Sequence, residues 1–209
     1  MKTSGIVALL LLIVTYCAAQ PAMQFGILTG MNIEERNRDF LQPYSELKYP
    51  IGFACGLYGY LPLQNFLHLQ AELYYFQSRS KYTGHAWEYY EIETTLTKKY
   101  VAIPVYLQVR ARNYFYVLLG IKNDVRINLN YQAHYLNEKV TLDSDVTSRA
   151  PSIDFYYSYG IGKDFNISGR KFKIETKISH QVNEHEILGP NEKWKYRQYE
   201  LLVGMELGH

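Results

Sequence analysis

Cysteine is scarce in this chain of 209 residues, which contains only Cys17 and Cys55. Cys17 lies in an N-terminal segment that we expect to be removed. The single cysteine that remains cannot form a disulfide within the chain, so the fold must be stable without a covalent cross-link.

Long apolar runs and an excess of charge are also missing. No segment beyond the N-terminus approaches 18 consecutive apolar residues, which excludes a helical membrane protein. The chain has 22 Lys and Arg residues against 20 Asp and Glu residues, a formal net charge of +2 that falls to +1 without Lys2. A nearly neutral chain gives no reason to expect nucleic acid as a partner.

The N-terminus has the pattern of a secretory signal peptide. Lys2 precedes an apolar run over residues 6–14, and the small residues Ala18 and Ala19 follow. We predict a signal peptide over residues 1–19 and one domain over residues 20–209. Cys17 could instead suggest a lipoprotein, but Tyr16 occupies the position where lipid attachment requires a small residue.

Residues 114–132 alternate between two kinds of side chain for nineteen residues, a period of two that indicates a strand. The apolar set is Phe115, Val117, Leu119, Ile121, Val125, Ile127, Leu129 and Tyr131. The set between them is Tyr116, Leu118, Gly120, Lys122, Asp124, Arg126, Asn128 and Asn130. Such a strand would reach roughly 60 Å, more than twice the ~25 Å apolar band of an outer-membrane barrel. It is therefore interpreted as a membrane-crossing strand with an extension outside.

Seven further segments alternate in the same way, which makes eight. They cover residues 25–33, 51–61, 67–75, 101–110, 114–132, 153–162, 172–179 and 198–207. Short connections (62–65, 111–113 and 166–170) alternate with long polar ones (34–50, 78–99, 133–151 and 183–195). This order predicts an all-β fold, an eight-stranded antiparallel up-and-down transmembrane β-barrel with short periplasmic turns and both termini in the periplasm. Pro104 cannot donate to a ladder, so we expect it to mark a bulge.

The alternation alone does not show which face of the sheet meets water. A soluble β-sandwich would bury its apolar side chains, whereas a membrane barrel would turn them toward lipid. The polar set suits a narrow lumen, since an eight-stranded barrel is only wide enough for side chains to fill. Charges there must pair to offset desolvation. We therefore predict a plugged lumen and no open pore, with a charge network of Glu72, Arg110, Lys122, Asp124, Arg126, Asp154, Lys173, Glu175, Lys177, Glu200 and Glu206.

The chain resembles the outer-membrane β-barrel domain family that includes PorT-like proteins. The resemblance rests on Phe25-Gly26 through Asn32, Gly52-Phe53 through Leu61-Pro62-Leu63, Leu69 through Tyr74, and Tyr100 with Ile103-Pro104-Val105. It implies an integral outer-membrane protein of a Gram-negative cell envelope, in contact with lipid and with the barrel-assembly machinery. Some relatives assist protein secretion, so an accessory role in secretion or envelope assembly is the alternative function. The family often has Pro where this chain has Ile121, and such barrels commonly end on an aromatic residue, whereas this chain ends with His209.

Catalytic motifs are missing. Ser179 and His180 are neighbours, but a period of two sends them to opposite faces. The sequence has no Gly-x-Ser-x-Gly elbow and no His-Glu-x-x-His pair, and the stretch 184–186 is interpreted as a solvated turn and not as a metal site. We predict no catalytic residue, metal or cofactor, although a lipid-modifying outer-membrane enzyme stays an alternative.

The outer connections are the expected recognition surface. The stretch 84–93 is aromatic and acidic, and we single out His85, Trp87, Tyr89, Tyr90 and, in the last connection, Trp194 for a structural or surface-interaction role with a protein partner in the envelope. Equally, this stretch could extend the sheet above the membrane. A secreted lipocalin-like barrel remains the other architecture, disfavoured by the missing Gly-x-Trp and the polar lumen.

Overall fold

The computed structural model describes residues 24–36, 46–48, 50–86, 90–111, 115–135, 140–145, 153–183, 185–186 and 193–207. The predicted signal peptide lies outside these residues. None of the described residues forms a helix that could cross a membrane.

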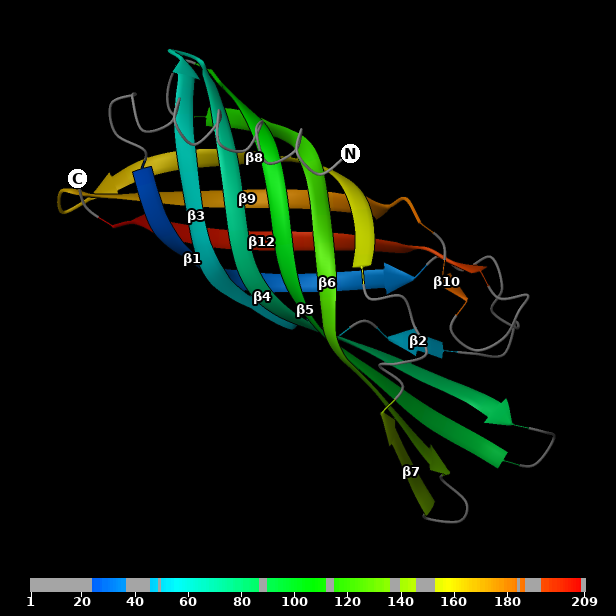
Figure 1. Cartoon of the computed structure of the whole chain (residues 1–209). Helices are drawn as coiled ribbons and strands as arrows, with labels where there is room; N and C mark the ends of the chain where they lie inside the picture. Colours follow the sequence, from blue (N-terminus) through cyan, green and yellow to red (C-terminus); the bar gives the residue numbers. More distant parts are fainter. Residues whose placement is uncertain are drawn as a thin grey trace.

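Eight long strands form one closed antiparallel ring (Figure 1). They are β1 (Gln24–Arg36), β3 (Gly52–Gln64), β4 (Leu67–Ala86), β5 (Tyr90–Arg110), β6 (Phe115–Tyr135), β8 (Ile153–Ile167), β9 (Arg170–Gln181) and β12 (Tyr196–Glu206). Each pairs with the next in this order, and β12 returns to pair with β1. The predicted eight-stranded up-and-down barrel is confirmed.

The register shows how steeply the strands tilt. A row of paired residues that starts at Phe115 on β6 passes once around the ring and returns to β6 at Val125, ten residues further along. For eight strands this displacement corresponds to a tilt of roughly 40°. Ten residues at that tilt rise about 25 Å along the barrel axis, the height expected of a membrane-facing apolar band.

Short turns join the strands at one end of the barrel. Asn65 and Phe66 connect β3 to β4, and Ser168 and Gly169 connect β8 to β9. Ser168 and Gly169 have φ values of 52° and 81°, which fits the type I′ turn that matches strand twist. These short turns occur where the sequence predicts them.

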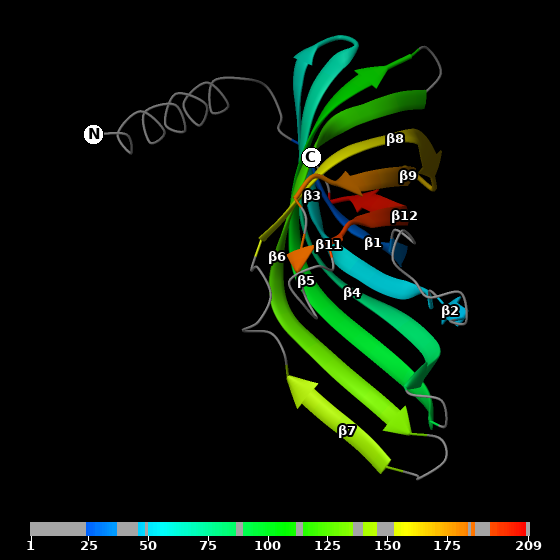
Figure 2. The ribbon, with the colours of Figure 1, turned by 90° about the vertical axis from the view of Figure 1, so that its right-hand side faces the viewer.

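At the other end, β4, β5 and β6 continue beyond the ring as a projecting sheet (Figure 2). β4 and β5 stay paired from Leu67 with Val109 to Ala86 with Tyr90. The short strands β2 (Glu46–Lys48) and β7 (Val140–Asp145) pair with β4 and β6. The prediction of a long polar connection over residues 78–99 is therefore wrong for the described residues, whereas the alternative, that the stretch extends the sheet, agrees with this pairing. The β-branched and aromatic residues of the segment favour extended strands.

The prediction that Pro104 marks a bulge is also wrong. Pro104 pairs in register with Lys122 of β6, and its missing N–H coincides with a gap in the ladder to β4, where Glu72 and Leu73 have no paired residue. The bulge lies elsewhere, because Lys99 pairs with Asn128 and Tyr100 with Arg126, which leaves Ile127 as an extra residue of β6.

The bulge reverses the two faces of β6 beyond Ile127. Leu129 belongs to the apolar set of the sequence pattern, yet its side chain is fully buried. The nineteen-residue alternation of the sequence therefore does not correspond to one inner and one outer face throughout. Because side chains alternate with a period of two, the one extra residue moves the apolar set from the outer to the inner face beyond the bulge.

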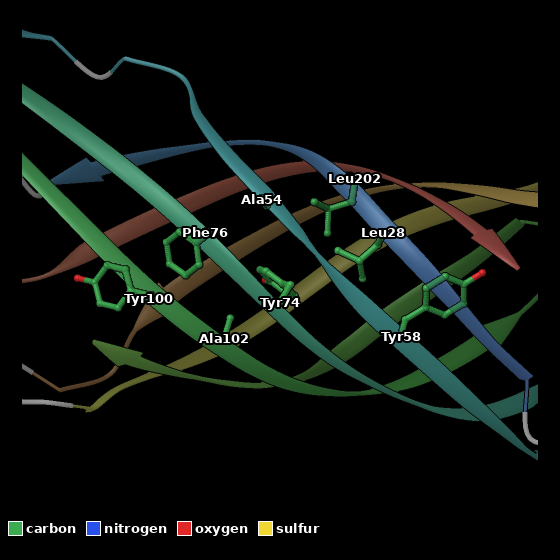
Figure 3. Close-up of a cluster of buried hydrophobic side chains, with 8 residues drawn as sticks. All are labelled: Leu28, Ala54, Tyr58, Tyr74, Phe76, Tyr100, Ala102 and Leu202. Atoms are coloured by element: carbon green, nitrogen blue, oxygen red, sulfur yellow. The ribbon is translucent and has the colours of Figure 1, made fainter. Parts of the chain in front are cut away.

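The apolar face of the barrel points outward. Leu119, Val105 and Leu201 are 53%, 37% and 40% exposed, as a membrane-facing wall requires. The interior is built from polar side chains and from rings that lie over glycines of the neighbouring strand. Figure 3 shows the largest buried apolar cluster, to which Tyr58, Tyr74 and Tyr100 contribute their rings. Cross-strand pairs of one ring and one glycine are Tyr58 with Gly26, Tyr74 with Gly56, Tyr106 with Gly120 and Tyr116 with Gly162.

Candidate functional site

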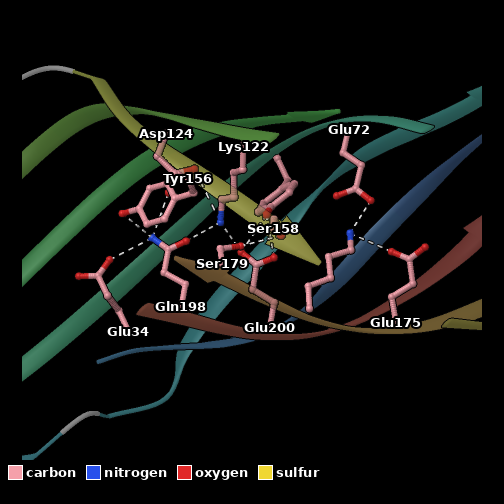
Figure 4. A network of polar contacts seen from close by, with 12 residues as sticks. Glu34, Glu72, Lys122, Asp124, Tyr156, Ser158, Glu175, Ser179, Gln198 and Glu200 are labelled. Carbon is pink, nitrogen blue, oxygen red and sulfur yellow. Dashed lines mark hydrogen bonds and ion pairs between the residues drawn. The ribbon is translucent and has the colours of Figure 1, made fainter. Parts of the chain in front are cut away.

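Polar contacts cross the lumen between strands that are not neighbours in the ring (Figure 4). In the half nearer the short turns, the Lys177 ammonium of β9 lies 2.5 Å from a carboxylate oxygen of Glu72 on β4 and 2.9 Å from one of Glu175. Lys173 lies 3.0 Å from Glu175, and the Tyr116 hydroxyl donates to the same carboxylate at 2.8 Å. Two carboxylates and two ammonium groups therefore form one buried cluster.

A second cluster surrounds Lys122 of β6. Its ammonium forms an ion pair with Glu200 of β12, donates to the Gln198 amide oxygen at 2.6 Å and lies 3.6 Å from Asp124. The Tyr74 hydroxyl donates to Glu200 at 2.8 Å. This cluster ties β4, β6 and β12 together across the middle of the barrel.

Two ion pairs lie at the long-loop end. The Lys98 ammonium of β5 donates to Glu34 of β1 at 2.5 Å, and Arg126 donates to Asp154 at 3.2 Å. Lys98 also lies 3.1 Å from the centre of the Tyr196 ring. Sequence reasoning missed Glu34 and Lys98, because it placed both in connections, although each continues the period of its strand.

At the short-turn end, Arg110 donates to Asp164 at 2.5 Å, and its guanidinium lies over the Tyr60 and Tyr116 rings. Glu206 accepts a hydrogen bond from Tyr60 at 3.2 Å and from the Lys171 ammonium at 3.3 Å. Asp164 was missed as well, since its strand was expected to end at residue 162.

The eleven residues of the predicted charge network thus all lie on the inner face, and the structure joins them into contacts with the three that were missed. Among the residues whose burial the structure describes, the buried charges are six acids (Glu34, Glu72, Asp124, Asp154, Glu175 and Glu200) and five bases (Lys98, Lys122, Arg126, Lys173 and Lys177). Nearly equal numbers of buried acids and bases are expected in the lumen, because an unpaired charge would bear the whole cost of desolvation.

The predicted recognition residues fall at the margins of the described chain. Trp87 and Tyr89 lie outside it. The backbones of His85 and Tyr90 belong to the tip of the β4–β5 hairpin, and the backbone of Trp194 belongs to β11 (Lys193–Trp194), which pairs with β10 (His185–Glu186). The structure therefore places three of the five on strands, in two separate hairpins, and its description does not extend to their side chains.

The neighbours Ser179 and His180 point in opposite directions. Ser179 is buried inside and donates to the Ser158 hydroxyl at 2.9 Å, while His180 lies outside between Tyr157 and Tyr159. No described residues form a group of three or more His, Cys, Asp or Glu side chains that could hold a metal ion. The described chain thus shows no pairing of this serine with a base.

The sequence matches one known family over most of its length. Residues 18–185 match the family described as outer membrane protein beta-barrel domain. No curated protein matches the sequence significantly.

Several solved structures are similar in shape. Ail, the attachment invasion locus protein of Yersinia pestis, is 15% identical with a TM-score of 0.46, over 88% of this chain and 99% of Ail. The outer membrane protease OmpT of Escherichia coli is 11% identical with a TM-score of 0.46, over 90% and 97% of the two chains. The outer membrane protein OprG of Pseudomonas aeruginosa is 11% identical with a TM-score of 0.40, over the same shares.

Proposed function

The chain belongs to the outer membrane protein beta-barrel domain family, and we propose that it acts there as a non-catalytic surface-interaction protein, with a plugged barrel that carries a recognition sheet outside the cell. As a barrel of the outer membrane it contacts lipid with its apolar wall. The short turns then lie in the periplasm and the projecting sheet lies outside.

The projecting sheet is the observation that carries this proposal. β4 and β5 continue for nine paired residues from Ser78 with Lys98 to Ala86 with Tyr90, and β6 and β7 widen the sheet on one side. A lipid-spanning barrel does not need these residues, because they lie beyond the last row of the wall that is apolar on all three strands, Tyr75 with Val101 and Val125. A rigid sheet held above a membrane is a suitable platform for a protein partner.

The plugged lumen supports a role at the surface and not as a channel. Ion pairs connect β4 with β9, β6 with β12 and β1 with β5, so side chains from opposite walls meet in the interior. Conduction would require these contacts to open at the cost of unpaired charges.

Shortening the hairpin tests the recognition role. Deletion of residues 84–92, with an Asn-Gly turn inserted between Thr83 and Glu93, keeps the pair that these two residues form. We expect a folded barrel that no longer captures its envelope partner in cross-linking on intact cells, whereas the full chain captures one. Unchanged capture by the folded variant would refute recognition by the tip, and loss of folding would show that the tip serves only to stabilise the sheet.

The same proposal covers export of the chain, its insertion into the membrane and its non-catalytic role. Residues 1–19 direct export, and the barrel-assembly machinery inserts the chain. Hydrolysis or transfer of lipid acyl groups by the purified barrel would contradict the non-catalytic role. An accessory role in secretion rests on the family resemblance alone, since no described residue favours it.

A further inference from the structure

The outward wall changes from apolar to polar within one step on β4 and β5. Tyr75 pairs with Val101, which pairs with Val125, and this is the last row that is apolar on β4, β5 and β6 together. On β6 the bulge residue Ile127 is one further apolar side chain on the outside, 52% exposed. In the next outward row, Gln77 pairs with Lys99, which pairs with Asn128.

Arg79 lies two residues beyond Gln77 on the same outward face. The residues next to the two cations, Ser78 and Lys98, point inward and are 1% and 0% exposed. Arg79 is accordingly exposed and Lys99 half-buried on the outside of the barrel. Diagonal neighbours on paired strands lie about 7–8 Å apart at their backbones, so two long side chains there can converge on one small group.

The bulge of β6 contributes to this arrangement. Because Ile127 is the extra residue, Asn128 lies directly opposite Lys99. A bulge of this kind redirects the side chains that follow it. Two cations and two amides, from Arg79, Lys99, Gln77 and Asn128, therefore lie on one outward patch, which we call the outer cation patch.

The two cations of this patch have no acidic partner within the described part of the chain. Lys81, two residues beyond Arg79, does have an acidic partner, since its ammonium lies 3.0 Å from Glu93. Arg197 reaches an acid only through Tyr199, to which it donates at 3.3 Å and which donates to Glu35 at 3.2 Å. The outer cation patch is therefore a local excess of positive charge.

The height of the patch limits what it can contact. The row through Val125 closes an apolar band of about 25 Å, and two further residues add about 5 Å along the axis. That distance corresponds to the headgroup layer next to the hydrocarbon core. A side chain on the outward wall at this height faces lipid headgroups.

We propose that the outer cation patch binds the phosphate group of a phosphorylated lipid of the outer leaflet. A guanidinium can donate two parallel hydrogen bonds to phosphate oxygens, and the ammonium supplies a second charge. The amide groups of Gln77 and Asn128 add neutral donors. The acyl chains of the same lipid then lie against the wall below, at Val101 and Val125.

Lipid binding by matched variants tests this proposal. The purified barrel in zwitterionic micelles is titrated with a phosphorylated glycolipid, with the same glycolipid after dephosphorylation and with inorganic phosphate, and native mass spectrometry counts the bound molecules. We expect tight retention of the phosphorylated lipid only. The double variant Arg79→Gln, Lys99→Gln should bind it about 10- to 30-fold more weakly, and each single variant should lose part of that factor.

Lys163→Gln is the matched control. Lys163 is an exposed wall lysine at the short-turn end, where its ammonium lies 4.8 Å from the centre of the Phe115 ring, and its loss should leave binding unchanged. Equal retention of both glycolipids, equal binding of inorganic phosphate, or an equal loss in Lys163→Gln would each overturn the proposal. If the double variant does not fold, the two single variants decide by the same comparison.

Discussion

Lys177 contacts carboxylates from two strands on opposite walls of the barrel, Glu72 and Glu175, and is fully buried. Lys177→Met would leave both carboxylates short of a cation in a desolvated interior. We expect a loss of about 3–5 kcal/mol in the free energy of unfolding, measured by urea titration in micelles. In Lys163→Met, which removes an exposed lysine, the change should stay within about 0.5 kcal/mol. A comparable loss in both variants would show that burial of Lys177 is not the cause.

Gly162 provides the space for the Tyr116 ring. A Cβ at this position would lie 2.3 Å from a ring carbon of Tyr116, closer than atoms can approach without a shift. Gly162→Ala should therefore cost about 1–3 kcal/mol of stability. The same substitution in a Tyr116→Leu background should cost much less, and equal costs in the two backgrounds would argue against the contact.

At this scale the sequence predicted many inner side chains, since a period of two on a strand of known extent assigns each residue to a face. Its errors have two physical sources. Glu34, Lys98 and Asp164 lie in strands that continue further than their apolar residues indicate. Leu129 lies on the inner face because of a bulge, which depends on the pairing with β5 and leaves no mark in the sequence of β6.

At the scale of strands, the bulge of β6 allows a deletion that a regular strand would not tolerate. Removal of Ile127 would restore an uninterrupted ladder with β5 and leave Leu129 on the inner face. We expect this variant to fold into the same barrel, shown by the shifted electrophoretic mobility of the unheated protein. Removal of Ile121 should abolish folding, because it would turn Lys122 and Asp124 toward lipid. Equal behaviour of the two deletions would contradict the assigned register.

The number of long strands, their order and the short turns could be predicted because alternation and turn residues are local signals. The projecting sheet was predicted only as an outer extension of residues 114–132 and as one of two alternatives for residues 84–93, since the alternation of β4 and β5 weakens beyond the ring. Pairing across three strands stabilises it, and pairing is not a property of one segment. The prediction that Pro104 marks a bulge was wrong for the same reason. The ladder between β4 and β5 has a gap at Pro104 and no extra residue.

For the whole molecule, the proposed plugged lumen predicts a barrel that does not conduct ions. Single molecules in a planar bilayer should show no steady conductance above the background of the lipid. The ion pairs of Lys98, Lys122 and Lys177 lie at successive heights, so an ion would have to displace several of them in turn. A stable open level from properly folded protein would contradict the plugged lumen.

Because β1 pairs with β12, the first and last strands of the ring are neighbours. Leu207 donates its backbone N–H to Phe25 at 2.9 Å, so the two ends of the domain are neighbours at the short-turn end. A circular permutant that joins these ends by a short linker and opens at Ser168 and Gly169 would preserve every ladder of the ring. The order in which the eight strands are synthesised is therefore separable from the order in which they stand side by side.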